Sequence, residues 1–169
     1  MTKPIDAARA FNLLSSALPG DWSGTRPNGA IVEVSYRLAA KRSVLAESWT
    51  LGPAVDALTL YHLDGERLIA SHFCPLGNQP RLQMIGMTEH RFDFAFFDAT
   101  GLDEGAAHQH SFWIDIISTD RFERSESYGA DCVSEIEQIA YARICSRLSR
   151  PSRPERLRPG PETTPRRGR

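Results

Sequence analysis

From Ile31 to Tyr128 the chain is a succession of short segments in which apolar and polar side chains alternate, with turn sequences between them. The clearest turn is Asp64-Gly65. An Asp-Gly pair between two alternating segments is a strong signal for a tight β-hairpin. Eight antiparallel strands are expected in all, at residues 31–38, 43–51, 56–63, 67–74, 82–87, 91–97, 110–117 and 121–128.

A sheet of this size must protect its edge strands from further pairing, and closure into an up-and-down barrel is a common solution. Such a barrel is wide enough for side chains or for one small ligand. Residues 6–18 carry apolar side chains at helical spacing and are followed by Pro19-Gly20, which predicts a helix. We therefore expect a mainly β fold, an antiparallel up-and-down barrel with an N-terminal helix. Residues 132–148 fit either a helix or a closing strand.

The charge distribution sets one part of the chain apart. The composition, 41% hydrophobic and 24% charged, is that of an ordinary soluble globular protein. Residues 150–169 hold seven arginines and two glutamates, a balance of +5 that leaves −6 for residues 1–149. They also hold five of the eleven prolines, so a disordered tail is expected. The predicted organisation is a helix at 1–19, a barrel domain at 20–149 and this tail.

The expected location is the cytoplasm. No apolar run is long enough to span a membrane, and Asp6 and Arg9 interrupt the N-terminal region early, unlike a secretory signal. The three cysteines, Cys74, Cys132 and Cys145, are odd in number and irregularly spaced, which favours a reducing compartment. No aromatic residue is interleaved with the arginines of the tail, so nucleic-acid binding is not expected. The sequence does not define the oligomeric state.

Two close pairs of residues carry metal-binding side chains, His72 with Cys74 and His108 with His110. Residues two apart on a strand point to the same side, so each pair offers two donors to one face. Imidazole and thiolate bind zinc, copper or iron, which makes these four residues candidate metal ligands. His110 shares its expected face with Phe112, Ile114 and Ile116, and this face is expected to line the barrel interior. The pattern does not decide which side of its strand His72 occupies. The favoured alternative is that the histidines are buried, hydrogen-bonded groups and that Cys74 is a small core residue.

A polar loop follows the same strand. Asn78 and Gln79 are candidate amide donors to a ligand at the barrel rim, although a turn-capping role of Asn78 is favoured. Arg81 is a candidate partner for a ligand carboxylate. The nearby acids Asp93 and Asp98 favour an internal ion pair instead.

Three further residues are candidates for the barrel interior. Glu47, if it faced inward, would be buried with a raised pKa and would suit general acid or base catalysis, but a position on the solvent face is favoured. Trp49 and Tyr61 suit either the lining of an apolar pocket or a plain core. The catalytic candidates are therefore His72, His110 and Glu47. The sequence has no phosphate-binding glycine loop and no Gly-x-Ser-x-Gly motif, which argues against nucleotide-dependent and serine-hydrolase chemistry.

Several motifs together carry a family resemblance. Residues 20–22 match the Gly-x-Trp signature of lipocalin-like (calycin) barrels, and they accompany YHLDGERLIASHFCPLGNQPR at 61–81, FDFAFFDATGL at 92–102 and a His-x-His at 108–110. The chain thus resembles a group of uncharacterised bacterial calycin-like proteins, distantly similar to nitrobindin-type haem-binding barrels. The resemblance implies a barrel with a cavity. Nitrobindins bind haem iron through a histidine in their C-terminal part, and no histidine follows His110 in this chain.

Three hypotheses of function follow. In the first, the barrel binds a small, largely apolar ligand, and His72, His110, Asn78 and Gln79 supply polar contacts. In the second, the same cavity belongs to an enzyme in which His72 or His110 acts as an acid or base or binds a transition metal or haem. In the third, the barrel is an accessory protein-interaction module with the basic tail as its tether.

Overall fold

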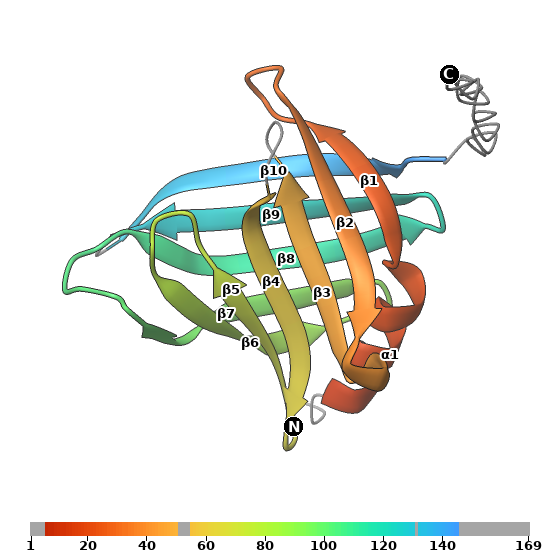
Figure 1. Ribbon diagram of the computed structural model, residues 1–169, viewed down its shortest axis with the longest axis horizontal. Helices are drawn as coiled ribbons and strands as arrows, with labels where there is room; N and C mark the ends of the chain where they lie inside the picture. Colours follow the sequence, from red (N-terminus) through yellow and green to blue (C-terminus); the bar gives the residue numbers. More distant parts are fainter. Residues whose placement is uncertain (1–5, 51–54, 131, 146–169) are drawn as a thin grey trace, which may run out of the picture.

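The computed structural model of the protein describes residues 6–50, 55–130 and 132–145. These residues form one α-helix, one short 3-10 turn and ten strands (Figure 1). Their bounds are α1 Ala7–Ala17, β1 Gly20–Thr25, β2 Ile31–Ala39, η1 Ala40–Arg42, β3 Val44–Thr50, β4 Val55–Asp64, β5 Arg67–Phe73, β6 Gln79–Met87, β7 Arg91–Thr100, β8 His108–Ser118, β9 Arg121–Gly129 and β10 Val133–Arg143.

Every strand pairs in antiparallel fashion with its neighbours in the sequence, and β1 also pairs with β10, which closes the sheet into an up-and-down barrel. The expected fold class is confirmed. The barrel has ten strands rather than the eight expected, because two further segments join the sheet. One is β1, and the other is β10, in the region 132–148 that fitted either a helix or a strand. The turn at Asp64-Gly65 forms the predicted hairpin, with Gly65 at φ 60°. The predicted tail at 150–169 lies outside the described residues, and the division into domains stays a prediction.

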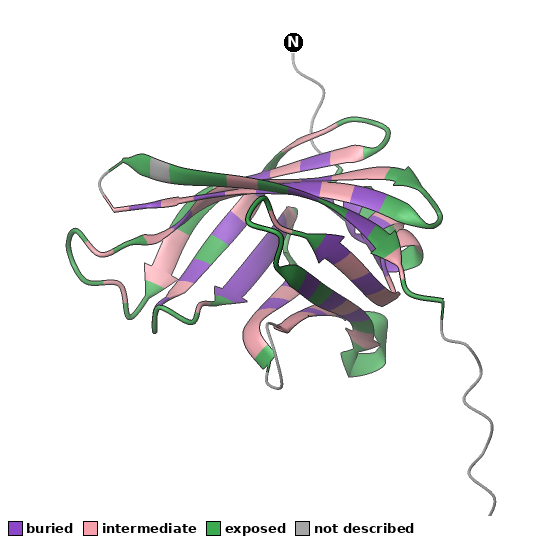
Figure 2. Cartoon of the chain, turned by 90° about the horizontal axis from the view of Figure 1, so that it is seen from above, coloured by how far each residue is buried: buried purple, intermediate pink, exposed green. Residues whose placement is uncertain are grey.

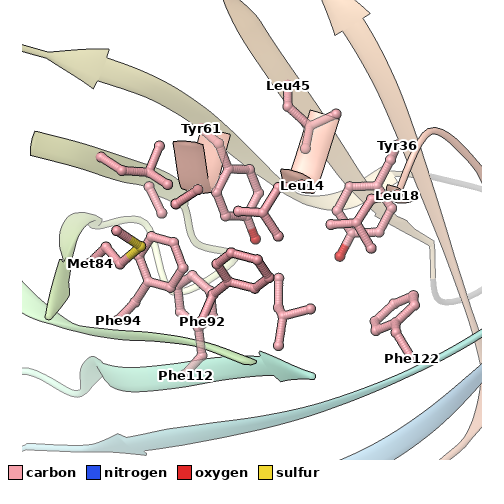
Figure 3. Close-up of a cluster of buried hydrophobic side chains, with 14 of the residues drawn as sticks. Leu14, Leu18, Tyr36, Leu45, Tyr61, Met84, Phe92, Phe94, Phe112 and Phe122 are labelled. Atoms are coloured by element: carbon pink, nitrogen blue, oxygen red, sulfur yellow. The ribbon is translucent and has the colours of Figure 1, made fainter. Parts of the chain in front are cut away.

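The helix α1 lies at one end of the barrel (Figure 1). Buried residues alternate with exposed or half-buried ones along the strands (Figure 2). It begins after Asp6, whose side chain accepts a hydrogen bond from the backbone N–H of Arg9 at 2.9 Å, a typical N-cap. Its apolar face packs against β4 and β5. Figure 3 shows Leu14 and Leu18 inserted among side chains of the strands. No helix in the described ranges is long and apolar enough to cross a membrane.

The apolar core lies beneath this helix. Phe94 stacks on Phe112 with ring centroids 4.5 Å apart, and Phe122 stacks on Tyr141 at 4.7 Å. Such aromatic pairs bury large areas in a fixed geometry. The core side chains come from α1 and from both halves of the sheet and include Leu14, Leu18, Trp22, Tyr36, Leu45, Leu68, Leu82, Met84, Phe92, Phe94, Phe112, Ile114 and Phe122.

The Gly-x-Trp motif joins the helix to the closing strands. The indole N–H of Trp22 donates to the carbonyl of Leu18 at 2.8 Å, and the Arg143 guanidinium lies 4.1 Å over the indole ring. Arg143 also donates to the carbonyls of Ala17 and Pro19 at 2.9 and 2.8 Å. Gly20 has φ 140°, and a Cβ there would collide with the Arg143 guanidinium. The glycine is therefore required by its backbone conformation, and an alanine there would also displace the end of the Arg143 side chain from its hydrogen bonds.

We expect Gly20→Ala to lower the free energy of unfolding by about 3 kcal/mol, because it adds a displaced Arg143 to backbone strain. Gly29→Ala is the matched control, since Gly29 also has a positive φ of 87° but no atom within 4 Å of the position that an alanine Cβ would take. The control should cost about 1 kcal/mol. Urea denaturation of both variants measures the difference, and equal losses would refute the role given to Arg143.

Candidate functional site

A cavity of about 400 Å³ lies at the end of the barrel opposite α1, at the start of β2 and β4 and the end of β3, β5 and β9. Its lining combines apolar side chains with several carboxylates and one histidine. The described lining residues are Arg26, Val32, Trp49, Asp56, Ala57, His72, Cys74, Pro75, Leu76, Ala107, Glu126, Tyr128, Gly129, Glu135 and Glu137.

Strand alternation places a polar layer directly below this cavity. On β3, Trp49 lines the cavity and Glu47 is the next inward-facing residue toward α1. On β9, Glu126 lines the cavity and Arg124 is the next inward-facing residue. Both Glu47 and Arg124 are buried. Because side chains two apart on a strand share a face, the same strands build the cavity wall and its floor.

Glu47 is completely buried and accepts three hydrogen bonds. The donors are Arg124 Nη1 at 2.6 Å, the Tyr61 hydroxyl at 2.5 Å and the Trp49 indole N–H at 2.5 Å. Burial alone would raise the pKa of Glu47, but the Arg124 charge and these hydrogen bonds outweigh burial and hold the pKa below its ordinary value. The preference for a solvent-facing Glu47 is therefore wrong. Its raised pKa is not found either, so Glu47 is an ionised structural partner of Arg124.

Arg124 is the centre of the buried polar layer, with 2% of its surface exposed. It contacts Glu47 on one side and pairs through Nε with Glu126 on the other. Its guanidinium also lies 4.3 Å from the centroid of the Phe112 ring and 5.2 Å from that of Trp49. Burial opposes its charge, but the two carboxylates raise the pKa of Arg124 well above its ordinary value. The side chain is thus permanently charged.

Glu126 connects this layer to the cavity. Its carboxylate pairs with Arg124 and accepts a hydrogen bond from the Tyr128 hydroxyl at 3.3 Å. Burial raises the pKa of Glu126 above its ordinary value, even though Arg124 acts in the opposite direction. Burial therefore disfavours the ionised form of Glu126, the carboxyl group at the boundary between the polar layer and the cavity.

His72 stands in the cavity wall and is only 3% exposed. Its Nδ1 is hydrogen-bonded to the Thr59 hydroxyl at 2.9 Å, whereas its Nε2 has no hydrogen-bond partner in the described parts of the chain. Burial lowers the pKa of His72 to about 4, so the ring is neutral at physiological pH. His72 and Cys74 share one face as predicted, and both line the cavity. Burial raises the pKa of the Cys74 thiol, which keeps it protonated.

An ion pair stands at the mouth of the cavity. Arg26, directly after β1, donates Nε and Nη2 to the two carboxylate oxygens of Glu137 on the neighbouring strand β10 at 2.8 and 2.7 Å, a bidentate contact. Glu135, on the same strand as Glu137, is exposed and also lines the cavity. The described lining thus carries four carboxylates, Asp56 included, against the single guanidinium of Arg26.

The expected inward face of His110 is wrong. A β-bulge interrupts the pairing of β8 with β9 between Gln109 and Ser111, so His110 is an extra residue without a partner in the register. The extra residue reverses the alternation, and Gln109 and Phe112 are buried instead. His110 stacks on His108 with ring centroids 4.4 Å apart, and neither histidine is among the described lining residues.

The hypothesised metal site is not formed. No group of three or more His, Cys, Asp or Glu side chains in the described residues is arranged to hold a metal ion. The physical reason is the bulge, which separates His108 and His110 from the cavity that contains His72 and Cys74.

Haem also does not fit this donor set. His72 Nε2 would offer one axial ligand, but haem carries two propionates. The described lining presents four carboxylates and only Arg26 as a cation, and Arg26 is already held by Glu137. Burying the propionates there would place them beside carboxylates of the same charge, which repel them.

The other candidate residues have structural contacts. Asn78 donates to the carbonyl of Ala107 at 2.8 Å and so ties two loops together, whereas Gln79 begins β6 and does not belong to the described lining. Arg81 forms the expected internal ion pair with Asp98 on β7. Trp49 lines the cavity, while Tyr61 lies in the polar layer beneath it.

Sequence reasoning missed the site residues of β9. Arg124 and Glu126 were part of a segment interpreted only as a polar strand. The available signal was their position between Phe122 and Tyr128, since all four residues have the same parity. A charged pair flanked by aromatic residues on one face indicates an inward-facing polar cluster.

Comparison with known proteins supports the fold. No protein-family model matches the chain, and no curated protein matches its sequence. Among solved structures, the barrel is similar to Rv2717c from M. tuberculosis, with a TM-score of 0.52 and 14% identity over 85% of this chain and 100% of that one.

It is also similar to a protein of unknown function from the DUF3598 family of Nostoc punctiforme PCC 73102, with a TM-score of 0.54 and 11% identity over 77% of this chain. The match spans about half of that protein, 49% of its length. At these identities the likeness establishes a shared barrel fold, and such a barrel is compatible with ligand binding.

We expect Glu47→Gln to lower the free energy of unfolding by about 3 kcal/mol, because Arg124 keeps its buried charge and loses a carboxylate partner. Asp98→Asn is the control, since it breaks an ion pair with Arg81 at the protein surface. That change should have a much smaller effect. Chemical denaturation of the two variants tests this, and a Glu47→Gln protein as stable as the wild type would contradict it.

The His72 pKa predicts a loss of stability in acid. The unfolded protein takes up a proton on His72 below pH 6.5, whereas the folded protein does so only near pH 4. The unfolded state therefore binds more protons in this window, and stability falls as the pH falls. Between pH 7.5 and pH 5 this group contributes a loss of about 2 kcal/mol.

His72→Gln should remove that part of the pH dependence. His90→Gln, at an exposed position, should not. Urea denaturation at both pH values measures the change, and a wild-type and His72→Gln pair with the same pH dependence would rule out the depressed pKa.

Proposed function

We propose that this protein is a calycin-like barrel that binds a small, largely apolar ligand in the cavity opposite α1, with His72 as its buried polar anchor. One observation carries the proposal. His72 Nε2 is a buried hydrogen-bonding atom in the cavity wall that has no partner in the described ranges. A buried polar atom without a partner is costly, and a ligand group that bonds to it offsets the cost.

The cavity suits such a ligand in size and surface. Small-molecule sites commonly enclose about 300 to 1,000 Å³ and combine apolar walls with a few polar groups. Here Val32, Trp49, Ala57 and Leu76 supply apolar wall. An apolar ligand body therefore meets favourable surface inside the cavity.

The chemistry of the site favours binding over catalysis. A pKa of about 4 makes His72 a weak general base near neutral pH, and Glu47 is held ionised beneath Trp49 and Arg124. The three cysteines are unpaired, as is usual in a reducing compartment, and the proposed location is therefore the cytoplasm. The barrel thus supplies a preformed pocket with one defined hydrogen-bonding position.

The proposal is tested with the uncharged probe 1-naphthalenemethanol and isothermal titration calorimetry. We expect one site with a dissociation constant of ~100 μM. Ala57→Phe fills the cavity and should weaken binding by about tenfold or more. Ala140→Phe, at an exposed position on β10, is the matched control and should bind the probe as the wild type does. Equal binding by both variants would contradict the proposal, as would absence of binding by this probe and by charged probes with the same ring.

A further inference from the structure

We infer that the ligand of this cavity is an organic cation, an apolar molecule that carries a protonated amine. The inference rests on the proposed ligand-binding function and specifies the chemical class of the ligand. Two independent observations carry it: the excess of carboxylates in the cavity wall, and the unpartnered, buried Nε2 of His72 among them.

The charge of the wall favours a cation. Leaving Asp56 aside, three glutamates of the described lining, Glu126, Glu135 and Glu137, face one lining cation, and that cation, Arg26, is already bound in bidentate fashion by Glu137. Below the wall, the Arg124 charge is shared between Glu47 and Glu126. The cluster therefore has two carboxyl groups for one guanidinium, and burial raises the pKa of Glu126. An ammonium group beside Glu126 would stabilise its ionised form.

The lining also offers the uncharged contacts that an alkylammonium group uses. Trp49 and Tyr128 place aromatic rings in the wall, and ring faces attract cations. In the tautomer in which His72 Nδ1 donates to the Thr59 hydroxyl, Nε2 carries a lone pair and accepts a hydrogen bond from an ammonium N–H. The ring is neutral near pH 7, so it adds no repulsion.

An anionic ligand is the main competing class. Arg124 Nη2 is buried and has no hydrogen-bond partner in the described residues, so a carboxylate could in principle approach it. Arg124 already contacts two carboxylates, however, and it is not part of the described cavity lining. A third carboxylate would add to a negative charge that is already in excess, which favours the cation over the anion.

Three probes with the same bicyclic ring separate these possibilities: 1-naphthylmethylamine, 1-naphthalenemethanol and 1-naphthoic acid. In calorimetry at pH 7 and low salt, we expect the amine to bind about tenfold more tightly than the alcohol, and the acid to bind most weakly. Added salt should weaken binding of the amine and leave that of the alcohol unchanged.

Glu135→Gln tests the wall charge without touching Arg124, because Glu135 is exposed at the mouth. It should weaken amine binding about threefold and leave alcohol binding unchanged. Glu66→Gln is the control, because Glu66 is an exposed acid in the β4–β5 turn and lies outside the cavity lining. It should change neither affinity. Glu126→Gln should have a larger effect on the amine than Glu135→Gln, with a thermal melt of that variant to verify that it folds.

Each outcome decides the inference. Equal binding of amine and alcohol would overturn the cationic ligand and leave the proposed cavity function intact. Tightest binding of the acid would overturn it in favour of Arg124 as the counter-ion. Binding of none of the three probes would refute the proposed function as well.

Discussion

The buried ion pair of Arg124 and Glu47 is the interaction on which the interior of this barrel depends. Removing two charges from water is expensive, and their mutual attraction compensates only when the remaining hydrogen-bonding positions are filled. Tyr61 and Trp49 fill them for Glu47, and Glu126 partners the other side of Arg124. Because these groups come from β3, β4 and β9, the pair connects strands on different sides of the barrel. Its removal would disturb both the core and the cavity.

The polar layer of Glu47 and Arg124 separates the two ends of the barrel interior. Toward α1 the interior is packed with apolar side chains, with Leu14 and Leu18 of the helix region inserted among the aromatic rings (Figure 3). Toward the other end the inward-facing residues are smaller or polar, such as Ala57 and His72, and a cavity of about 400 Å³ remains. The floor of that cavity holds the buried ion pair of Arg124 and Glu47. A ligand there meets a lining that combines apolar side chains with carboxylates, which a purely apolar barrel would not offer.

Local patterns predicted most of the sheet, and long-range contacts account for the rest. The hairpin at Asp64-Gly65 depends only on neighbouring residues, and it formed as expected. Strand β1 was missed because GDWSGT has little alternation; it is a strand because Val34 and Tyr141 lie beside it in the sheet. The prediction that His110 faces inward was wrong for a similar reason, because the bulge at His110 arises from the pairing of β8 with β9. A bulge is decided by the register of two strands, and period-two counting within one strand does not reveal it.

By itself the sequence determined the fold class, the N-terminal helix and the shared face of His72 and Cys74, because these depend on periodicity and turn chemistry within short segments. Only the tertiary structure decided that this face is the cavity wall, and that Glu47 lies buried beside an arginine 77 residues further along the chain. The physical reason is that burial and charge pairing depend on barrel closure, which brings together strands that are distant in the sequence. The site is therefore a property of closure rather than of any one segment.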